Sequence, residues 1–142
     1  MRRLLFTLAL LCALPAQALD FRSTANPAAI LYDAPSPEAK RLFVLSKGYP
    51  LEVVVSITGW AKVRDNSGAM AWIALDQLSS TRTLVVRSAS SIRTAPKNTA
   101  PVSAKVAANV ILVWLENSGD WAKVRLPNQS TGYIQLKQVW GA

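Results

Sequence analysis

The 142-residue sequence contains no histidine and a single cysteine, Cys12. The absence of histidine excludes Ser-His-Asp and Cys-His catalytic groups and every metal site that requires an imidazole ligand. Acidic residues are scarce, with eight against sixteen lysines and arginines, and their spacing shows no calcium loop and no evident pair of catalytic carboxylates. A glycine-rich phosphate-binding loop is also absent. We therefore expect a protein that is not an enzyme and that uses no cofactor and no metal.

The first eighteen residues have the layout of a secretory signal peptide. Arg2 and Arg3 give a basic start, an apolar run follows over residues 4–14, and Ala16 and Ala18 are the small residues that precede a cleavage site. The apolar run has about eleven residues, whereas a membrane-spanning helix needs roughly twenty, so a short membrane anchor is the less favoured interpretation. We expect cleavage after Ala18 and an exported protein, periplasmic or secreted, with no transmembrane segment in the mature chain.

Cleavage would leave a mature chain without cysteine and with fourteen cations against eight anions, a net charge of +6. Such a charge favours envelope polyanions, or peptidoglycan with its stem-peptide carboxylates, as partners. The cations are interpreted as spread along the chain without forming a stripe, and export takes the protein away from nucleic acid, so no nucleic-acid partner is expected. The same charge is also compatible with nothing more than solubility.

The mature sequence repeats itself with an offset of 61 residues. The segment Trp60–Arg64, with the sequence WAKVR, recurs unchanged as Trp121–Arg125. The same offset aligns Ala34-Pro35 with Ala95-Pro96, Leu51 with Leu112, Ile73 with Ile134, Leu75 with Leu136 and Gln77 with Gln138. No gap is needed between residues 34 and 78, which indicates two copies of one structural unit.

The repeat divides the mature chain into three parts. Residues 19–27 are expected to be a mobile leader, residues 28–80 the first unit and residues 81–142 the second. Each unit has about sixty residues, close to the lower size limit for a domain with a single core. The polar link at residues 79–83 is short, so we expect the two units to touch.

Apolar and β-branched runs alternate with turn residues in both units, and no window shows a sustained helical period. The expected strands are 42–46, 51–57, 60–64 and 70–75 in the first unit, and 102–107, 110–116, 121–126 and 132–139 in the second. Short strands separated by turns predict an all-β fold. Closure of each unit into a small barrel would remove the exposed edges of these valine-rich strands.

The pattern of these strands resembles the bacterial Src-homology-3-like (SH3b) domains. The resemblance rests on a Trp-x-Lys-Val-Arg strand, a turn that carries glycine, and an aromatic-Ile strand that ends in leucine, all present twice. Ala34-Pro35 and Ala95-Pro96 occupy the place of the family's small-residue and proline loop, although residues 31–33 and 92–94 replace its usual Asn-Val-Arg strand. The resemblance implies two tandem SH3-like β-barrels of five strands each, which act as binding or targeting modules in the bacterial envelope.

Strand alternation divides the side chains of each WAKVR strand between two faces. Because lysine and arginine are rarely buried without a partner, Ala61 and Val63 are expected to point inward and the other three side chains outward. In the next strand Ile73 and Leu75 should point inward, and Trp72 outward beside the same row. The inward residues of the second unit are then Ala122, Val124, Ile134 and Leu136. The candidate ligand-binding residues are Trp60, Lys62, Arg64, Trp72, Trp121, Lys123, Arg125 and Tyr133.

Aromatic rings stack on sugars and peptides, and neighbouring cations pair with carboxylate or phosphate. The sequence therefore favours a non-enzymatic envelope module that recognises a cell-wall (peptidoglycan) component through these aromatic and basic faces. The alternative is an adaptor that binds a peptide or a partner protein. The same aromatic rings are also suited to packing alone, against the sister unit or Trp140. Lys105, Lys47 and Arg41 are interpreted as ordinary solvated charges.

Overall fold

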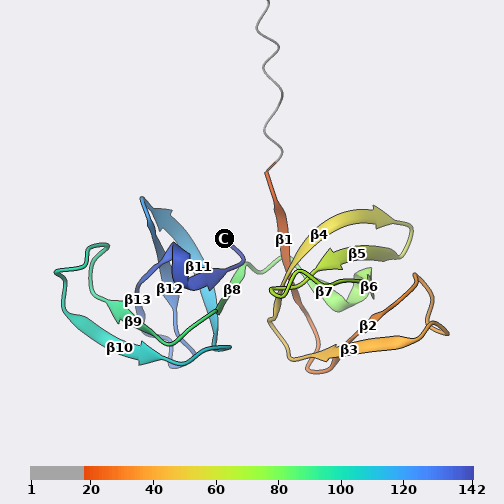
Figure 1. Ribbon diagram of the computed structural model, residues 1–142, viewed down its shortest axis with the longest axis horizontal. Helices are drawn as coiled ribbons and strands as arrows, with labels where there is room; N and C mark the ends of the chain where they lie inside the picture. The colour runs from red at the N-terminus through yellow and green to blue at the C-terminus, as the bar shows by residue number, and fades with distance from the viewer. Residues whose placement is uncertain (1–17) are drawn as a thin grey trace, which may run out of the picture.

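The computed structural model describes residues 18–142, which form two β-sheet units side by side (Figure 1). The predicted signal peptide lies outside the described residues, except for Ala18. The all-β prediction is confirmed, because the described part of the chain contains strands and only two short 3₁₀ turns, η1 (Leu75–Gln77) and η2 (Leu136–Gln138). Within residues 18–142, no helix is long and apolar enough to cross a membrane.

The two sheets have seven strands each and the same order of strands. The first sheet runs β3-β2-β6-β5-β4-β1-β7 and the second runs β10-β9-β13-β12-β11-β8-β14. The strands of the first sheet are β1 (Asp20–Thr24), β2 (Ala29–Tyr32), β3 (Arg41–Leu45), β4 (Pro50–Ile57), β5 (Trp60–Arg64), β6 (Met70–Ala74) and β7 (Leu78–Ser79). Those of the second are β8 (Thr83–Val86), β9 (Ser90–Arg93), β10 (Val102–Val106), β11 (Ile111–Ser118), β12 (Trp121–Arg125), β13 (Thr131–Gln135) and β14 (Val139–Trp140). The correspondence, strand by strand, is what the internal repeat predicts.

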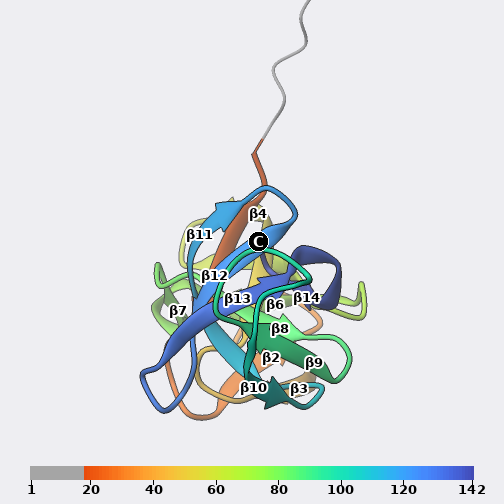
Figure 2. The ribbon, with the colours of Figure 1, turned by 90° about the vertical axis from the view of Figure 1, so that its left-hand side faces the viewer.

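The sheets are not closed into barrels, so the prediction of two closed five-stranded barrels is wrong. The outermost strands of the first sheet, β3 and β7, do not pair with each other, and neither do β10 and β14 in the second. The β2–β3 hairpin joins the rest of its sheet through one paired position, Tyr32 with Trp72. The edge strand β7 has only two residues. The equivalent β9–β10 hairpin also joins the rest of its sheet through one paired position, Tyr133 with Arg93, and Figure 2 shows this unit end-on.

The segment expected to be a mobile leader is instead a strand of the first sheet. Asp20–Thr24 forms β1, which pairs antiparallel with β4 and with β7. Of its three buried residues only Phe21 is apolar, and the other two, Ser23 and Thr24, are polar, so the segment has a weak apolar pattern. The Oγ1 of Thr24 donates to the carbonyl oxygen of Ser46 at 2.6 Å and accepts from the backbone N–H of Tyr49 at 3.0 Å. These bonds satisfy the buried hydroxyl and hold the strand in place.

Each unit has its own hydrophobic core, built from the residues that alternation places inward. Ala61, Val63 and Ile73 are fully buried in the first unit, as predicted. Their equivalents Ala122, Val124 and Ile134 are fully buried in the second. Leu75 departs from the prediction because the chain turns into η1 at this residue, which breaks the alternation and leaves Leu75 38% exposed. Leu136 begins η2 in the same way and packs partly buried against its core.

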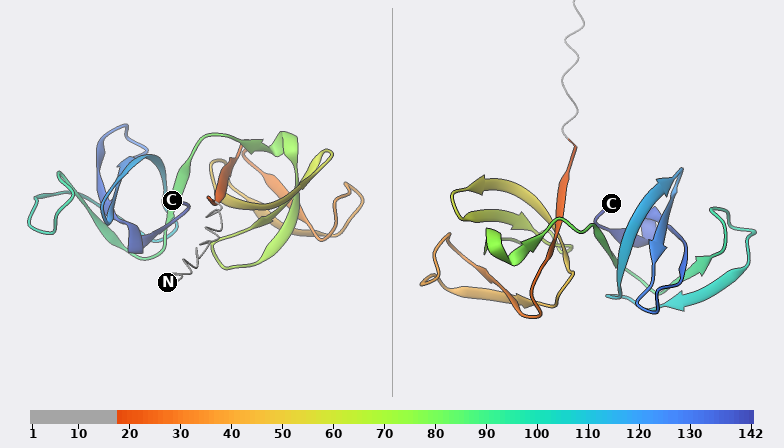
Figure 3. Two further views of the ribbon diagram at one scale, coloured as in Figure 1. Left: turned by 90° about the horizontal axis from the view of Figure 1, so that it is seen from above. Right: turned by 180° about the vertical axis from the view of Figure 1, so that it is seen from behind.

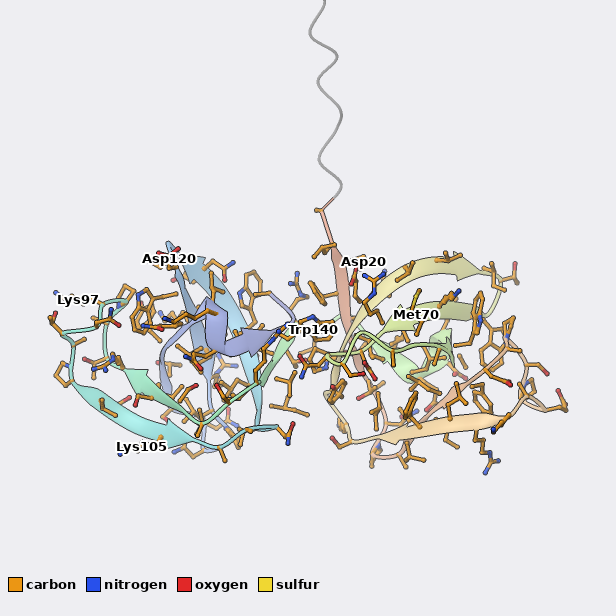
Figure 4. The ribbon with its side chains drawn as sticks, viewed as in Figure 1. Asp20, Met70, Lys97, Lys105, Asp120 and Trp140 are labelled. Carbon is orange, nitrogen blue, oxygen red and sulfur yellow. The ribbon has the colours of Figure 1, made fainter. Side chains whose placement is uncertain are left out.

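The two units touch, as the short link predicts. All four residues of β8 are buried, because Leu84 and Val86 face the second core while Thr83 donates from its Oγ1 to the carbonyl oxygen of Gly48 in the first unit, at 2.7 Å. Figure 3 shows the link and the C-terminus between the two units, and Figure 4 places Trp140 there. The ring of Phe21 on β1 meets the ring of Trp140 edge-on, with centroids 5.1 Å apart.

Candidate functional site

The strand register brings the expected aromatic residues and cations together on one face of each sheet. Residues directly opposite each other in neighbouring antiparallel strands share a face. Lys62 lies opposite Trp72 in the first unit, and Lys123 lies opposite Tyr133 in the second. We call the face that carries these residues, away from the core, the outer face of each unit. That the eight candidate residues bind a ligand remains a prediction.

The outer face of the second unit continues onto strands that the sequence interpretation did not include. Tyr133 lies opposite Arg93 on β9, and Ser91 on the same strand lies opposite Lys105 on β10. Ile92, between Ser91 and Arg93, is buried in the core. Alternation therefore places Ser91, Arg93 and Lys105 on the outer face together with Tyr133.

Trp121 is not the exposed outward residue that alternation predicts, since only 8% of it is accessible. It lines a groove of about 410 Å³ in the second unit, which we call the Trp121 groove. The other residues that line this groove are Ala89, Ser90, Ser91, Arg93, Lys105, Val106, Gln135 and Gln138. The β9–β10 hairpin supplies most of these residues and so forms one wall of the groove.

Some polar side chains of the Trp121 groove already form hydrogen bonds with neighbouring residues. One terminal nitrogen of Arg93 donates to the carbonyl oxygen of Ala100 at 2.8 Å, which fixes the guanidinium and leaves its other N–H groups for a ligand. The side-chain oxygen of Gln138 accepts from the hydroxyl of Ser88 at 2.7 Å. Gln138 therefore offers its amide N–H groups. Figure 4 shows Lys105 at the edge of the second unit.

The cations of the second outer face have no carboxylate partner among residues 18–142. The ion pairs found there are Arg22 with Asp20 and Arg64 with Glu52, at 3.3 and 2.9 Å. Both therefore involve residues of the first sheet. Arg125, the equivalent of Arg64, lies opposite Val113 and not opposite an acid. A carboxylate from outside the described chain would meet cations that are not already neutralised.

The outer face of the first unit has a different chemistry at the same positions. The repeat offset places Tyr32 where the second unit has Arg93, and Val44 where it has Lys105. Ile30, which corresponds to Ser91, lies opposite Val44, and Val44 is 67% exposed. The ring of Tyr32 packs edge-on against half-buried Trp60, with centroids 5.6 Å apart. At these three positions the first unit thus has apolar and aromatic side chains in place of a serine and two cations.

The net charge of the predicted mature chain lies entirely in the second unit. Residues 28–80 contain five lysines and arginines and five acids, whereas residues 81–142 contain eight and two, a net +6. Cations occur in both units, so this asymmetry comes as much from the acids as from the lysines and arginines. The interpretation of Lys105 as an ordinary solvated charge did not include its place in the groove. Arg93 was not singled out from the sequence either. Comparing the two copies position by position would have marked both, because each cation replaces an uncharged residue of the first unit.

Tyr49 is a titratable residue that lies away from both outer faces. Burial raises the pKa of Tyr49, which packs against the first core and not on an outer face. Within residues 18–142, no group of three or more histidine, cysteine or acidic residues is placed to hold a metal ion. The arrangement is suited to non-covalent recognition of a ligand.

Comparisons with known proteins identify the family of this chain and several similar solved structures. The family model described as "Bacterial SH3 domain" matches residues 25–80 and 88–141. The comparison with curated proteins found no match. Two solved structures from Trichomonas vaginalis, NlpC2 and NlpC1, are 19% and 20% identical, each with a TM-score of 0.40, and the matches cover 87% and 94% of this chain. An NlpC/P60 family protein from Bacillus cereus is 15% identical over 84% of this chain, also with a TM-score of 0.40. This chain spans 48%, 50% and 55% of the three proteins, which is about half their length.

Proposed function

Because this chain belongs to the bacterial SH3 domain family, we propose that it is a non-enzymatic module of the bacterial envelope that binds a cell-wall (peptidoglycan) component. SH3b domains are binding modules and often bind cell wall. The predicted signal peptide supports export to the periplasm or beyond, where such a ligand is found. The observation that carries the proposal is the Trp121 groove, which joins an indole to cations that have no acid partner in the described chain.

The composition of the groove suits a ligand made of sugars and short peptides. An indole gives a flat apolar surface for a sugar ring or a peptide backbone. The side chains of Gln135, Gln138 and Ser91 supply hydrogen-bonding groups around it. Arg93 and Lys105 add positive charge that a stem-peptide carboxylate would complement. The candidate residues Lys123, Arg125 and Tyr133 extend this surface across the outer face.

Retention on insoluble peptidoglycan tests the proposal. Mature wild-type protein should sediment with purified peptidoglycan, and Trp121→Ala and Tyr133→Ala should reduce the sedimented fraction. Circular dichroism must show that Trp121→Ala still folds, because this side chain is largely buried. Phe43→Ala is the matched control, since Phe43 lies opposite buried Leu31 and so does not share the outer face. Equal retention of all four proteins would refute the assignment of the outer face as the surface that binds peptidoglycan.

A protein-interaction adaptor is the second candidate function, and the first unit favours it. Strand β3 is an open edge with exposed Leu42, Phe43 and Val44. Val55 and Ile57 on β4 add further exposed apolar surface. An extended peptide is able to add to such an edge through backbone hydrogen bonds. Co-purification of a stoichiometric partner protein, together with no retention on peptidoglycan, would favour the adaptor over the wall-binding module.

A further inference from the structure

We propose that only the second unit recognises the ligand, and that the Trp121 groove selects a sugar or peptide that carries a free carboxylate. This inference rests on the proposed function and adds to it the class of ligand and the unit that binds it. It follows from three features of the described residues: the two cations that line the groove, the polar groups that surround them, and the absence of these cations at the same place in the first unit.

The first feature is the convergence of two cations from neighbouring strands. Arg93 on β9 and Lys105 on β10 line the same groove. Lys105 lies opposite Ser91, which is two residues from Arg93 on the same side of its strand. The bond from Arg93 to the carbonyl oxygen of Ala100 holds the guanidinium in one orientation. A guanidinium held in this way and an exposed ammonium group in the same groove are suited to an anionic oxygen pair.

The second feature is the mixed chemistry of the remaining lining. Two glutamines, two serines and one indole surround the two cations. Polyanions such as nucleic acid or polyphosphate are bound mainly through many cations that follow the charged backbone. Two cations among amides, hydroxyls and an indole are suited to a ligand that has mostly neutral polar groups and a single acidic group. A carboxylate on a sugar or peptide has this composition.

The third feature is the contrast with the first unit. The residues Ile30, Tyr32 and Val44 replace Ser91, Arg93 and Lys105, so no cation stands at these positions. Arg64, the remaining guanidinium of its outer face, is already paired with Glu52, whose side chain is only 13% exposed. A carboxylate placed at Ile30, Tyr32 and Val44 would lose its hydration without gaining the arginine and lysine that stand there in the second unit. The outer face of the first unit keeps Lys62 opposite Trp72 and Arg41 opposite Tyr32, which do not reproduce that pair. The ligand should therefore occupy one site per chain.

Nuclear magnetic resonance titration of the ¹⁵N-labelled mature protein with muramyl dipeptide tests the inference. The compound is used in two forms, with its carboxyl group free and with this group amidated. The free acid should shift the backbone signals of residues 90–93 and 105 and the indole signal of Trp121, and leave those of residues 29–32 and 44 in place. Amidation should weaken binding about tenfold or more, because it removes the charge from hydrogen bonds to Arg93 and Lys105.

Variants at the two cations separate a specific site from general charge attraction. Arg93→Gln with Lys105→Gln should remove the preference for the free acid. Arg41→Gln with Lys47→Gln, at exposed positions of the first unit, changes the net charge equally and should leave the preference intact. Loss of preference in both double variants would overturn the inference in favour of nonspecific attraction.

The two proposals fail in different ways. Equal binding of the free and amidated compounds, or shifts confined to the first unit, would overturn the carboxylate inference while leaving wall binding intact. Lack of retention on peptidoglycan, combined with carboxylate-dependent shifts in the Trp121 groove, would overturn the proposed function and keep the assignment of the groove. Tighter binding of polyphosphate than of the free acid would show that the groove recognises a polyanion, and would also overturn the inference.

Discussion

The two units share the same strand order and the same pattern of buried residues, but their solvent-facing residues differ in chemistry. Leu51, Val63 and Ile73 are buried in the first core at the positions that Leu112, Val124 and Ile134 occupy in the second. On the outer faces, Val44 corresponds to Lys105 and Tyr32 to Arg93. The comparison teaches that the fold depends on the inward half of each strand, which leaves the outward half able to diverge.

Even an identical pentapeptide has different environments in the two units. The segment WAKVR forms β5 and β12, yet Trp60 is half-buried against Tyr32 while Trp121 is buried beside a groove. Arg64 lies opposite Glu52 and pairs with it, whereas Arg125 lies opposite Val113. The strands on either side therefore decide what each of these side chains can do.

The largest expected effect tests the shared interior. Leu51→Ala and Leu112→Ala each empty a fully buried site at equivalent positions of the two cores. Each should lower the free energy of unfolding by about 2–5 kcal/mol, as measured by urea denaturation. The substitution Val102→Ala, at an exposed position, is the control and should change the free energy of unfolding little. A large cost at only one of the two leucines would show that one unit depends on the other for its stability.

A smaller effect is expected where the two interiors differ. A Cβ atom added at Gly132 would lie 2.4 Å from the Cγ2 of Ile92 and 3.0 Å from the carbonyl oxygen of Arg93, although the equivalent residue in the first unit is Ala71. Gly132→Ala should therefore destabilise the second unit by about 1–3 kcal/mol. The reverse exchange Ala71→Gly introduces no clash and is the control. Unchanged thermal unfolding of Gly132→Ala would mean that β9 moves away without cost.

Grafting the two cations onto the first unit sharpens the comparison of the outer faces. Tyr32→Arg with Val44→Lys reproduces the charges of the Trp121 groove at the equivalent positions. We expect the first unit to gain affinity for the free acid form of muramyl dipeptide by about tenfold over its wild-type surface, because a charged hydrogen bond contributes on that scale. Isothermal titration should then report a second site. Tyr32→Gln with Val44→Gln is the uncharged control, and equal affinity of both grafts would argue against a role for charge.

The smallest effect is expected at the ion pair that only the first unit has. Arg64→Gln should lower stability by at most about 1 kcal/mol, because the side chain of Arg64 is 41% exposed and solvent screens the pair. Arg125→Gln should have no measurable effect on stability, since Arg125 has no acid partner among the described residues. Chemical denaturation at low and high salt measures both variants. A greater loss for Arg125→Gln than for Arg64→Gln would contradict the assignment of the pair.

Several features of the fold were predictable because local patterns report them directly. The repeat at an offset of 61 residues predicts two similar units, and alternation predicts the buried side of the WAKVR strands. Strand β1 escaped prediction because only Phe21 of its three buried residues is apolar, while the burial of Ser23 and Thr24 depends on hydrogen bonds to Thr81 and Ser46. Closure of the sheets was predicted wrongly, because pairing between distant edges leaves no periodic signal along the chain.

The sequence alone was enough to predict the all-β class, the duplication, the inward-facing core residues of each unit and an export signal. Each of these predictions depends on neighbouring or regularly spaced residues. Only the tertiary structure decided that the sheets stay open, that Trp121 is buried beside a groove, and that Arg93 and Lys105 both line that groove. These features depend on strand register and on hairpin β9–β10, which bring together residues from separate parts of the chain. Their physical basis is long-range pairing, and no local pattern of residues encodes it.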